Sequence, residues 1–357
     1  MRATYIKVFL ILLSFFITTT LFANNVAARK IKRVFIVCSY EKNNICGQPQ
    51  YDGIISALGE NGWINGKNIT IATYYMDTKK NNNTPVLIKK QANIALAKIQ
   101  DFVPDIVITV DDNAFRTVAL PLVDKPTKSV FSSMTTQPEE YNRVVHFMEN
   151  RKKPGHNITG VYEKLHVRES LQVLSKIIAL KKVRILTDIS PTGKAISRQV
   201  KIELKPSDNT ISLPCQIDYH TIKSWEEYGN EIKAINSDPA ISAYYLATLL
   251  LKDASGTTYT APDIISYSLK HAKKPAMGPN YAFIKLGLFG GASVDFFAMG
   301  RQAGKMASTI LKGGNPGKLP IQDARRIALV FNLKRARTLG INIPQDIFLA
   351  ADEVFDN

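Results

Sequence analysis

Residues 105–113 read DIVITVDDN, and this stretch decides the fold. Its apolar, mostly β-branched core predicts a strand that is buried on both faces, as in a parallel sheet covered by helices. Two carboxylates and an amide follow without a break, namely Asp111, Asp112 and Asn113. Capping of a helix would use only one of these side chains. We therefore expect Asp112 or Asn113 to contact a ligand.

The sequence on either side alternates strands and helices. Strands are expected at residues 33–38, 69–75 and 129–133, and helices at residues 51–58 and around Phe115 and Val118. A further helix, which stops before Pro104, places five apolar side chains on one face: Ile88, Ala92, Ala95, Leu96 and Ile99. This alternation predicts a doubly wound α/β unit.

A basic segment with Pro and Gly, residues 151–156, is typical of a linker. After it the pattern restarts, with strands expected at residues 158–162, 183–187, 211–217, 241–248 and 275–278 and a helix at 167–180. Two successive units of one type predict an α/β fold with two doubly wound parallel-sheet lobes that face one another across a cleft.

Candidate ligand-binding residues follow the strands, because small ligands bind outside the carboxyl ends of parallel strands. In the first unit these candidates are Ser39, Tyr40, Tyr51, Asp52, Asp112, Asn113, Ser132 and Ser133. In the second unit they are Tyr162, Glu163, Thr248, Asn280 and Tyr281, and Asp295 joins them at the start of a later helix. Carboxylates, hydroxyls and tyrosine rings suit a small polar solute.

Signatures of enzymes, cofactors and metals are missing from the sequence. The five histidines have no ligand spacing, and there is neither a Walker loop nor a serine elbow. The glycines 287, 290 and 291 follow a loop, so they do not form a dinucleotide fingerprint. We expect a binding protein without catalytic residues, cofactor or metal. An exported enzyme that uses Asp111 or Asp112 as a base is the remaining alternative.

The N-terminus has the order of a secretory signal. Arg2 and Lys7 precede an uncharged run at residues 8–22, and small residues follow at Ala23 and Ala28. We predict a signal peptide at residues 1–28, with cleavage after Ala23 as the alternative. No cysteine follows either position, so we expect a periplasmic protein without a lipid anchor.

The chain carries a formal net charge of +16, and its lysines are spread along helix faces without interleaved aromatic residues. This favours a solvated basic surface and no nucleic-acid partner. Three cysteines are too few for a disulfide framework, although a bridge between Cys38 and Cys46 remains open. We expect a monomer.

The C-terminal third carries a specific resemblance. Residues 292–304 read ASVDFFAMGRQAG, residues 305–322 read KMASTILKGGNPGKLPIQ, and residues 331–355 read FNLKRARTLGINIPQDIFLAADEVF. These stretches resemble the substrate-binding proteins of a family of ABC importers with the type I periplasmic-binding fold, some of which bind aromatic amino acids. The polar loop at residues 41–50 and the acids Asp111 and Asp112 depart from the family pattern, and they favour a ligand with an amine or several hydroxyls.

The resemblance implies that the chain crosses between lobes more than once. Lobe 1 then comprises residues 29–135 and 295–318, lobe 2 comprises residues 136–294 and 319–357, and hinges lie near Thr135, Val294 and Leu319. The helix that starts at Asp295 is expected to bury Phe297, Met306 and Ile310 in lobe 1, with Gly300 and Gly304 permitting close packing.

The resemblance also implies that a solute closes the two lobes and that an ABC permease in the inner membrane is the partner. A sensor kinase is the alternative partner.

Overall fold

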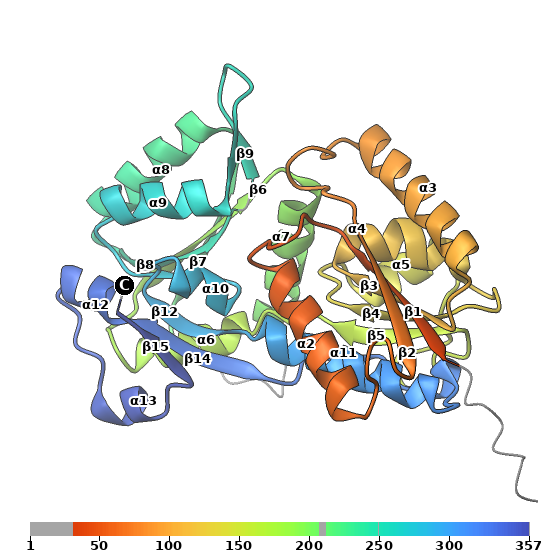
Figure 1. Cartoon of the computed structure of the whole chain (residues 1–357). Helices are drawn as coiled ribbons and strands as arrows, with labels where there is room; N and C mark the ends of the chain where they lie inside the picture. Colours follow the sequence, from red (N-terminus) through yellow and green to blue (C-terminus); the bar gives the residue numbers. More distant parts are fainter. Residues whose placement is uncertain (1–30, 207–211, 249, 357) are drawn as a thin grey trace, which may run out of the picture.

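The computed structural model describes residues 31–206, 212–248 and 250–356, and it shows two α/β lobes side by side (Figure 1). The two-lobed, mostly parallel architecture confirms the expected fold class. The predicted signal peptide at residues 1–28 lies outside the described residues. Among the described residues, no helix is long and apolar enough to span a membrane.

Lobe 1 is built on a six-stranded sheet with the order β13-β5-β4-β3-β1-β2, in which every pairing is parallel. Its strands are β1 (Lys32–Cys38), β2 (Ile69–Tyr75), β3 (Ile106–Val110), β4 (Lys128–Ser132), β5 (Ile158–Tyr162) and β13 (Gln322–Asp323). The strand expected within DIVITV is therefore confirmed as β3, a central strand with all five residues buried.

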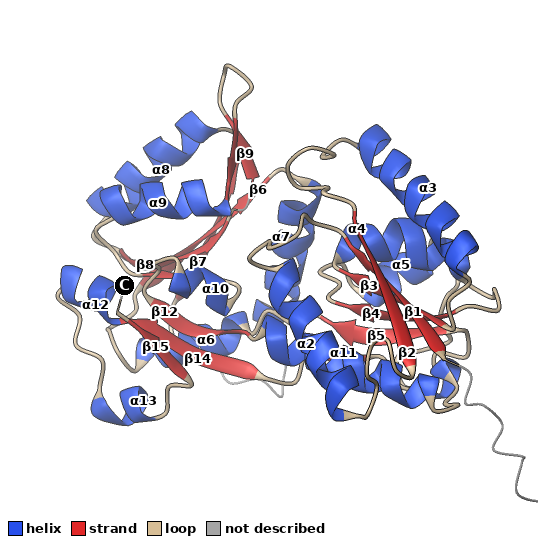
Figure 2. Cartoon of the chain, in the orientation of Figure 1, coloured by secondary structure: helices blue, strands red, loops and turns tan. Residues whose placement is uncertain are grey.

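Helices cover both faces of this sheet (Figure 2). Because side chains alternate along a strand, Val34 and Ile36 of β1 pack with α2 and α11 on one face, whereas Phe35 and Val37 pack with α3 on the other. The helical segments of lobe 1 are α2 (Gly47–Glu60), α3 (Pro85–Phe102), α4 (Asp112–Ala114), η1 (Phe115–Ala119), η2 (Leu120–Leu122), α5 (Pro138–Asn142), α11 (Phe296–Leu311) and η3 (Pro316–Lys318).

Lobe 2 contains a parallel sheet with the order β11-β8-β6-β7. Its strands are β6 (Lys182–Asp188), β7 (Gln216–Ile222), β8 (Ile241–Ala247) and β11 (Ala276–Met277). Its helices are α6 (Val167–Ser175), α7 (Pro191–Leu204), α8 (Trp225–Ser237), α9 (Ala261–His271) and α10 (Tyr281–Lys285). A short hairpin of β9 (Leu250–Lys252) and β10 (Thr258–Thr260) extends this lobe.

A second sheet completes lobe 2. In it β14 (Ile327–Asn332) pairs antiparallel with β12 (Gly290–Val294) and parallel with β15 (Glu353–Phe355). The last helices are α12 (Leu333–Thr338) and α13 (Gln345–Leu349).

The strand at residues 158–162 lies in a different sheet from the one expected. It pairs with β4 and with β13, so residues 136–162 stay with the sheet of lobe 1. The segment 151–156, interpreted as a linker, is a surface connection between α5 and β5. The chain therefore crosses after β5 rather than near Thr135, and after β13 rather than near Leu319. The chain also passes from β12 to α11 between Val294 and Phe296.

Two further elements differ from their predictions. The strand expected at 211–217 is β7, which begins at Gln216, and the helix expected at 167–180 ends at Ser175. In both cases apolar residues beyond the element, such as Leu213 and Ile178, pack against the core without belonging to it. Apolar periodicity alone cannot separate an element from such a packed connection.

Helix α11 packs closely against α2, as the glycines predicted. A Cβ at Gly300 would lie 2.1 Å from the Gln50 carbonyl oxygen, and one at Gly304 would lie 2.8 Å from that of Ile54. Met306 and Ile310 are buried, as expected. Phe297 is not: it is 37% exposed, because it turns toward Arg301 on the outer face.

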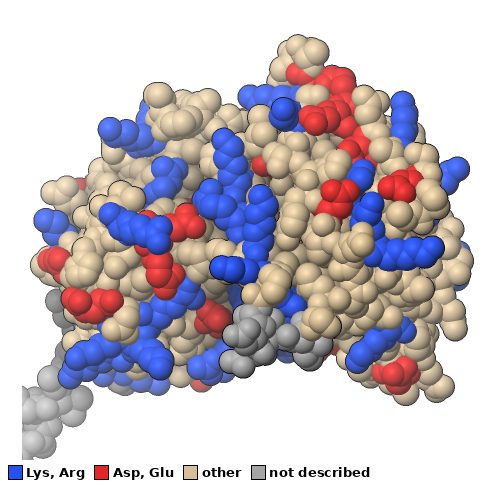
Figure 3. All heavy atoms as spheres, turned by 180° about the vertical axis from the view of Figure 1, so that it is seen from behind, with Lys and Arg blue, Asp and Glu red and all other residues tan. Residues whose placement is uncertain are grey.

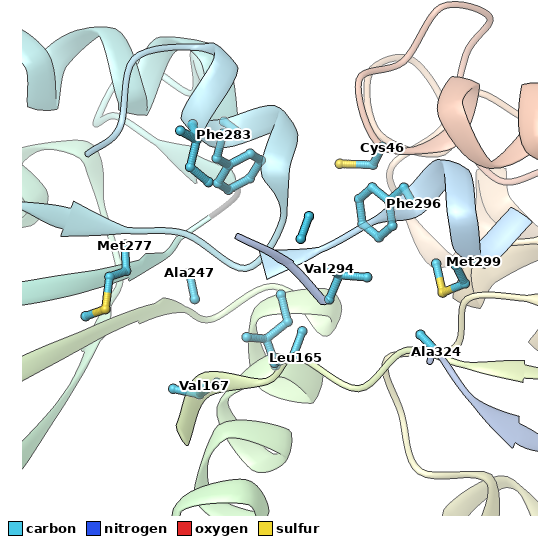
Figure 4. Packing of buried hydrophobic residues seen from close by; sticks show 14 of the residues in the cluster. Cys46, Leu165, Val167, Ala247, Met277, Phe283, Val294, Phe296, Met299 and Ala324 are labelled. Carbon is cyan, nitrogen blue, oxygen red and sulfur yellow. The ribbon is translucent and has the colours of Figure 1, made fainter. Parts of the chain in front are cut away.

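The three crossing segments share one apolar core. Figure 4 shows Leu165 after β5, Val294 at the end of β12 and Ala324 after β13 at the junction of the lobes, with Phe296 and Met299 beside them. Each of these five side chains is at most 3% exposed. The connections between the lobes are therefore packed against one another.

The surface carries charges of both signs. On the face opposite to that of Figure 1, Lys and Arg are spread over both halves with a group near the middle, and Asp and Glu lie among them (Figure 3). The described cysteines Cys38, Cys46 and Cys215 are free thiols, so the bridge that the sequence left open is not formed.

Candidate ligand-binding site

Four strand ends of lobe 1 meet at one edge of its sheet. Tyr40 follows β1, Asp111 follows β3, Ser133 follows β4 and Glu163 follows β5. These strands are neighbours in one parallel sheet, in the order β5-β4-β3-β1. Their carboxyl ends therefore lie at the same edge of that sheet, where small ligands commonly bind. The edge therefore places an acidic, polar group of side chains opposite lobe 2.

Asp111 is the most deeply buried carboxylate of this edge that lacks a full set of partners. It is 5% exposed, and its Oδ1 accepts a hydrogen bond of 3.0 Å from Gln50 Nε2. Its Oδ2 has no hydrogen-bond partner among the described residues. Burial raises the pKa of Asp111 to about 7, although the bond from Gln50 acts in the opposite direction.

Glu163 lies beside it at the end of β5. It is 6% exposed and accepts hydrogen bonds from the hydroxyls of Ser133, at 2.5 Å, and Thr135, at 3.3 Å. Burial raises the pKa of Glu163 to about 7, and the negative charges of Asp111 and Asp112 add to this rise. Asp111 and Glu163, at the same edge of the sheet, thus each have a pKa of about 7.

Asp112 adds a third carboxylate and is partly exposed. It accepts hydrogen bonds from the Tyr141 hydroxyl, at 2.7 Å, and from the backbone of Thr136, at 3.3 Å, while burial raises its pKa. We call Asp111, Asp112 and Glu163 the carboxylate cluster. None of its members forms an ion pair with a described side chain. Lys79, which lies 4.5 Å above the Tyr40 ring, lowers the pKa of Asp111.

Two residues of this edge have unusual backbone conformations. Asp111 has φ 68° and ψ 168°, and Ser133 has φ 66°, although neither is glycine. Such conformations cost about 1–3 kcal/mol each and gather at functional sites. Here they turn the chain sharply after β3 and β4, which leaves both side chains at the crevice.

Lobe 2 adds buried polar atoms without partners. Thr248, at the end of β8, is 1% exposed, and Asn280, ahead of α10, is 3% exposed. The Thr248 hydroxyl, the Asn280 Oδ1 and the Tyr245 hydroxyl have no hydrogen-bond partner among the described residues. Buried polar atoms are normally paired, so these three atoms are candidates for contact with a ligand.

Two observations join these atoms to lobe 1. The Asn280 Nδ2 lies 4.0 Å from the Cys46 sulfur. The pKa of Tyr245 is raised well above its ordinary value by burial, then by the charges of Glu203 and Glu163. Asn280 therefore lies near Cys46 of lobe 1, and Tyr245 is close enough to Glu163 to be affected by its charge.

A cavity of about 410 Å³ lies between loops of lobe 1 and the N-terminus of α9 in lobe 2, and Lys79, which lies over the Tyr40 ring, is part of its lining. Small-molecule sites commonly have volumes of about 300–1,000 Å³. Residues of lobe 1 and of the α9 N-terminus line this cavity: Glu41, Asn43, Asn44, Ile45, Lys79, Lys80, Thr260, Ala261, Pro262 and Asp263.

Of the predicted site residues, Tyr40, Ser133 and Glu163 each follow a strand at the same edge of the lobe 1 sheet, Asp112 lies beside Asp111 there, and Thr248 and Asn280 are buried in lobe 2; their contact with a ligand stays a prediction. Ser39 and Ser132 are buried close by and are engaged by protein atoms. The Ser39 hydroxyl donates to the Val110 carbonyl and accepts from the Ala114 amide, both at 2.8 Å. Ser132 donates to Gln50 Oε1 at 2.8 Å. These two serines position the strand ends.

The other predicted residues lie elsewhere. Asn113 bonds to Thr78 and Arg116, Tyr51 packs against Tyr75, and Asp52 is an exposed residue of α2. The Tyr162 side chain points away from Glu163, since neighbours in a strand face opposite sides, and its ring lies under Arg151. Tyr281 and Asp295 line a separate cavity of about 220 Å³ with Arg326.

The list of candidates drawn from the sequence lacked four residues of the crevice. These are Gln50, Lys79, Asp111 and Tyr245. Asp111 was considered as a helix cap, as a catalytic base and as one of two acids that favour an amine ligand, but it was not among the candidate site residues, and its backbone conformation has no signal in the sequence. Gln50 lies within α2 and Lys79 in the loop after β2, so neither directly follows a strand in the sequence.

The protein has two doubly wound lobes, and three segments of the chain connect them. Polar side chains lie where the lobes face one another. This architecture is that of a two-lobed solute-binding protein. The model of the family described as "ABC transporter substrate binding protein" matches residues 47–355. The chain belongs to this family, whose members bind a small-molecule substrate for a transporter permease.

Solved structures share the fold. One is the structure of an ABC domain in complex with L-Trp from Streptococcus pneumonia, with 20% identity and a TM-score of 0.68, covering 91% of this chain and 99% of the other. Another is the ligand-free, open structure of CD0873, a substrate-binding protein with adhesive properties from Clostridium difficile, with 17% identity and a TM-score of 0.67, covering 92% and 100%.

A third is a conserved domain protein from Vibrio cholerae, with 19% identity and a TM-score of 0.67, covering 91% and 100%. No curated protein sequence matches the chain significantly. The family consists of substrate-binding proteins and not of enzymes, which agrees with the expectation that this chain is not an enzyme.

Proposed function

We propose that this protein is the periplasmic solute-binding component of an ABC importer and that its ligand is a small polar molecule with a positively charged amine. The observation that carries this proposal is the carboxylate cluster. Asp111, Asp112 and Glu163 lie together in the crevice without an ion-pair partner among the described residues. A ligand amine would supply the missing positive charge and hydrogen-bond donors.

The energetics favour such a ligand. A buried carboxylate that lacks a cation is costly, and the raised pKa values of Asp111 and Glu163 express that cost. An ammonium group beside Asp111 Oδ2 would lower both pKa values and so gain free energy by ionising both acids. Neutral hydroxyls would gain less, because they bring no charge.

Lobe 2 supports the same proposal from the opposite side. The free Asn280 Oδ1 and the Thr248 and Tyr245 hydroxyls offer acceptors and donors to the rest of the solute. Because the two polar sets belong to different lobes, a ligand that bonds to both favours the closed arrangement over the open one. Hinge closure is therefore the proposed mechanism, with the crossings after β5, β12 and β13 as the hinge.

A thermal-shift screen of amino acids, polyamines, sugars and nucleosides tests this function. We expect amines and amino acids to raise the melting temperature of the wild type, and an amine at 100 times its Kd to add about 2.7 kcal/mol of stability. The double variant Asp111→Asn and Glu163→Gln should lose this response. Asp52→Asn, an exposed acid of α2, is the matched control and should keep it. A screen in which only neutral sugars stabilise the protein would contradict the proposal.

A further inference from the structure

The connection between α5 and β5 gathers two histidines and a glutamate on the surface of lobe 1, outside the crevice. Nitrogen atoms of His146 and His156 and a carboxylate oxygen of Glu149 all lie within 4.8 Å of one another. The His146 and His156 rings meet at 89° with their centroids 5.0 Å apart. Spacing in the sequence did not reveal this group, because a turn of the chain brings the two histidines together.

We propose that His146, Glu149 and His156 bind a divalent transition metal ion of the zinc type. Imidazole nitrogens and a carboxylate oxygen are ligands that Zn²⁺ accepts, and three protein ligands leave a fourth position for water.

His156 is already prepared for such a role. Its Nδ1 lies 2.8 Å from the carboxylate of Asp124. With the proton on Nδ1, which donates to that carboxylate, Nε2 keeps its lone pair free for a metal ion. That Nε2 is buried and has no hydrogen-bond partner among the described residues, and Glu149 Oε1 lies 3.9 Å from it. A carboxylate that orients a histidine through its second nitrogen is the usual outer partner of a zinc ligand.

The outer partner is itself held in place. The Asp124 amide donates to the Asn157 side chain at 2.8 Å, and that side chain donates to the carbonyls of Leu122 and Thr127, both at 2.7 Å. The Asp124 backbone therefore has a fixed position before any ion arrives, and its carboxylate contacts His156.

The backbone holds the ligands at short range. The Glu149 amide donates to the Pro154 carbonyl at 2.7 Å, which closes residues 149–154 into a tight turn. Gly155 has φ +83°, and a Cβ there would lie 2.8 Å from Glu149 Cγ, so the turn permits only glycine at this distance. His146 and Glu149 are exposed, which leaves their side chains free to close onto an ion from 4.8 Å to coordination distance.

Other histidines lack this arrangement. His220 also has two acidic neighbours, Asp218 and Glu231, but Arg184 forms ion pairs with both at 2.6 Å and 2.5 Å. Those carboxylates are already neutralised, whereas Glu149 pairs only with His156 among the described residues.

Isothermal titration of the wild type with Zn²⁺ alone, on protein made without a polyhistidine tag, tests the site. We expect one ion per chain and a rise in melting temperature on binding. His146→Ala and His156→Ala should each weaken binding by at least tenfold, and Asp124→Asn by about 10–100-fold, the range for outer partners of metal ligands. His271→Ala, on α9 in lobe 2, is the matched control and should bind as the wild type does.

X-ray absorption at the zinc edge gives a readout that needs no variant. It should report two imidazoles and oxygen ligands at about 2.0–2.2 Å. Absence of stoichiometric binding, or full affinity in either the His146 or the His156 variant, would overturn the proposal.

Discussion

Replacement of Asp111 by asparagine should stabilise the ligand-free protein, and more so at high pH. The pKa of this acid rises from 3.8 to about 7 on folding, so the folded protein takes up a proton that the unfolded chain has released. The contribution of Asp111 to the free energy of unfolding is therefore fully present below about pH 4, and it is lost as the pH rises through about 7. Asparagine carries no charge and escapes this loss.

The magnitude follows from the size of the shift. At pH 8 the ionised Asp111 costs the folded state about 4 kcal/mol; at pH 5, where the folded acid is protonated and the unfolded acid is ionised, the proton uptake on folding costs about 2 kcal/mol. The asparagine Oδ1 can still accept from Gln50 Nε2, and Oδ2 has no bond to lose. We therefore expect Asp111→Asn to raise the free energy of unfolding by up to about 4 kcal/mol at pH 8 and by about half as much at pH 5.

Urea unfolding at pH 5 and pH 8, on protein refolded to remove any bound solute, measures this difference. The control is Asp52→Asn, which should change stability by less than about 0.5 kcal/mol at both values, as surface substitutions usually do. A destabilised Asp111→Asn protein, or a gain that is the same at both pH values, would refute the reasoning.

Three other predictions concern the crevice and the packing of lobe 1. Affinity for an amine ligand should rise between pH 5.5 and 7.5, and binding should release protons, because the ligand lowers the raised pKa values of Asp111 and Glu163. Calorimetry in buffers of different ionisation enthalpy measures the number of protons released. Uptake of protons on binding would contradict this prediction. Gly300→Ala should destabilise the protein by several kcal/mol, about the size of a severe core defect, since its Cβ would meet the Gln50 carbonyl at 2.1 Å. Gly59→Ala, with open space in α2, should instead stabilise by about 0.5–1 kcal/mol in the same urea assay. Asn280→Cys should place a second thiol near Cys46, because the Asn280 Nδ2 lies 4.0 Å from the Cys46 sulfur. Closure of the lobes on a ligand should then speed oxidation of the two thiols to a disulfide, and a rate of oxidation that the ligand leaves unchanged would argue against closure there.

Local patterns in the sequence were enough for most of the strands. Buried runs such as residues 106–110 are apolar on both faces, and strand β2 begins and ends at the predicted residues. The glycines of α11 indicated its close packing, because only a residue without a Cβ fits there. Such features depend on near neighbours in the chain.

Local patterns could not predict which strands belong to the same sheet. β5 looks like the first strand of a new unit, but its partners are β4 and the distant β13, whose pairing depends on a return of the chain more than 150 residues later. The same holds for the crevice. Tyr245 and Glu163 come together only through the arrangement of the lobes, and the conformation of Asp111 depends on strands β3 and β4 turning at the same edge.

Native mass spectrometry of the protein, purified without refolding from cells that make it, weighs whatever solute the crevice holds. We predict an added mass that matches one small molecule with a basic amine, present on the wild type and on Asp52→Asn and missing from the Asp111→Asn and Glu163→Gln double variant. A solute that carries no amine, or one that the double variant retains, would contradict the role given to the buried acids.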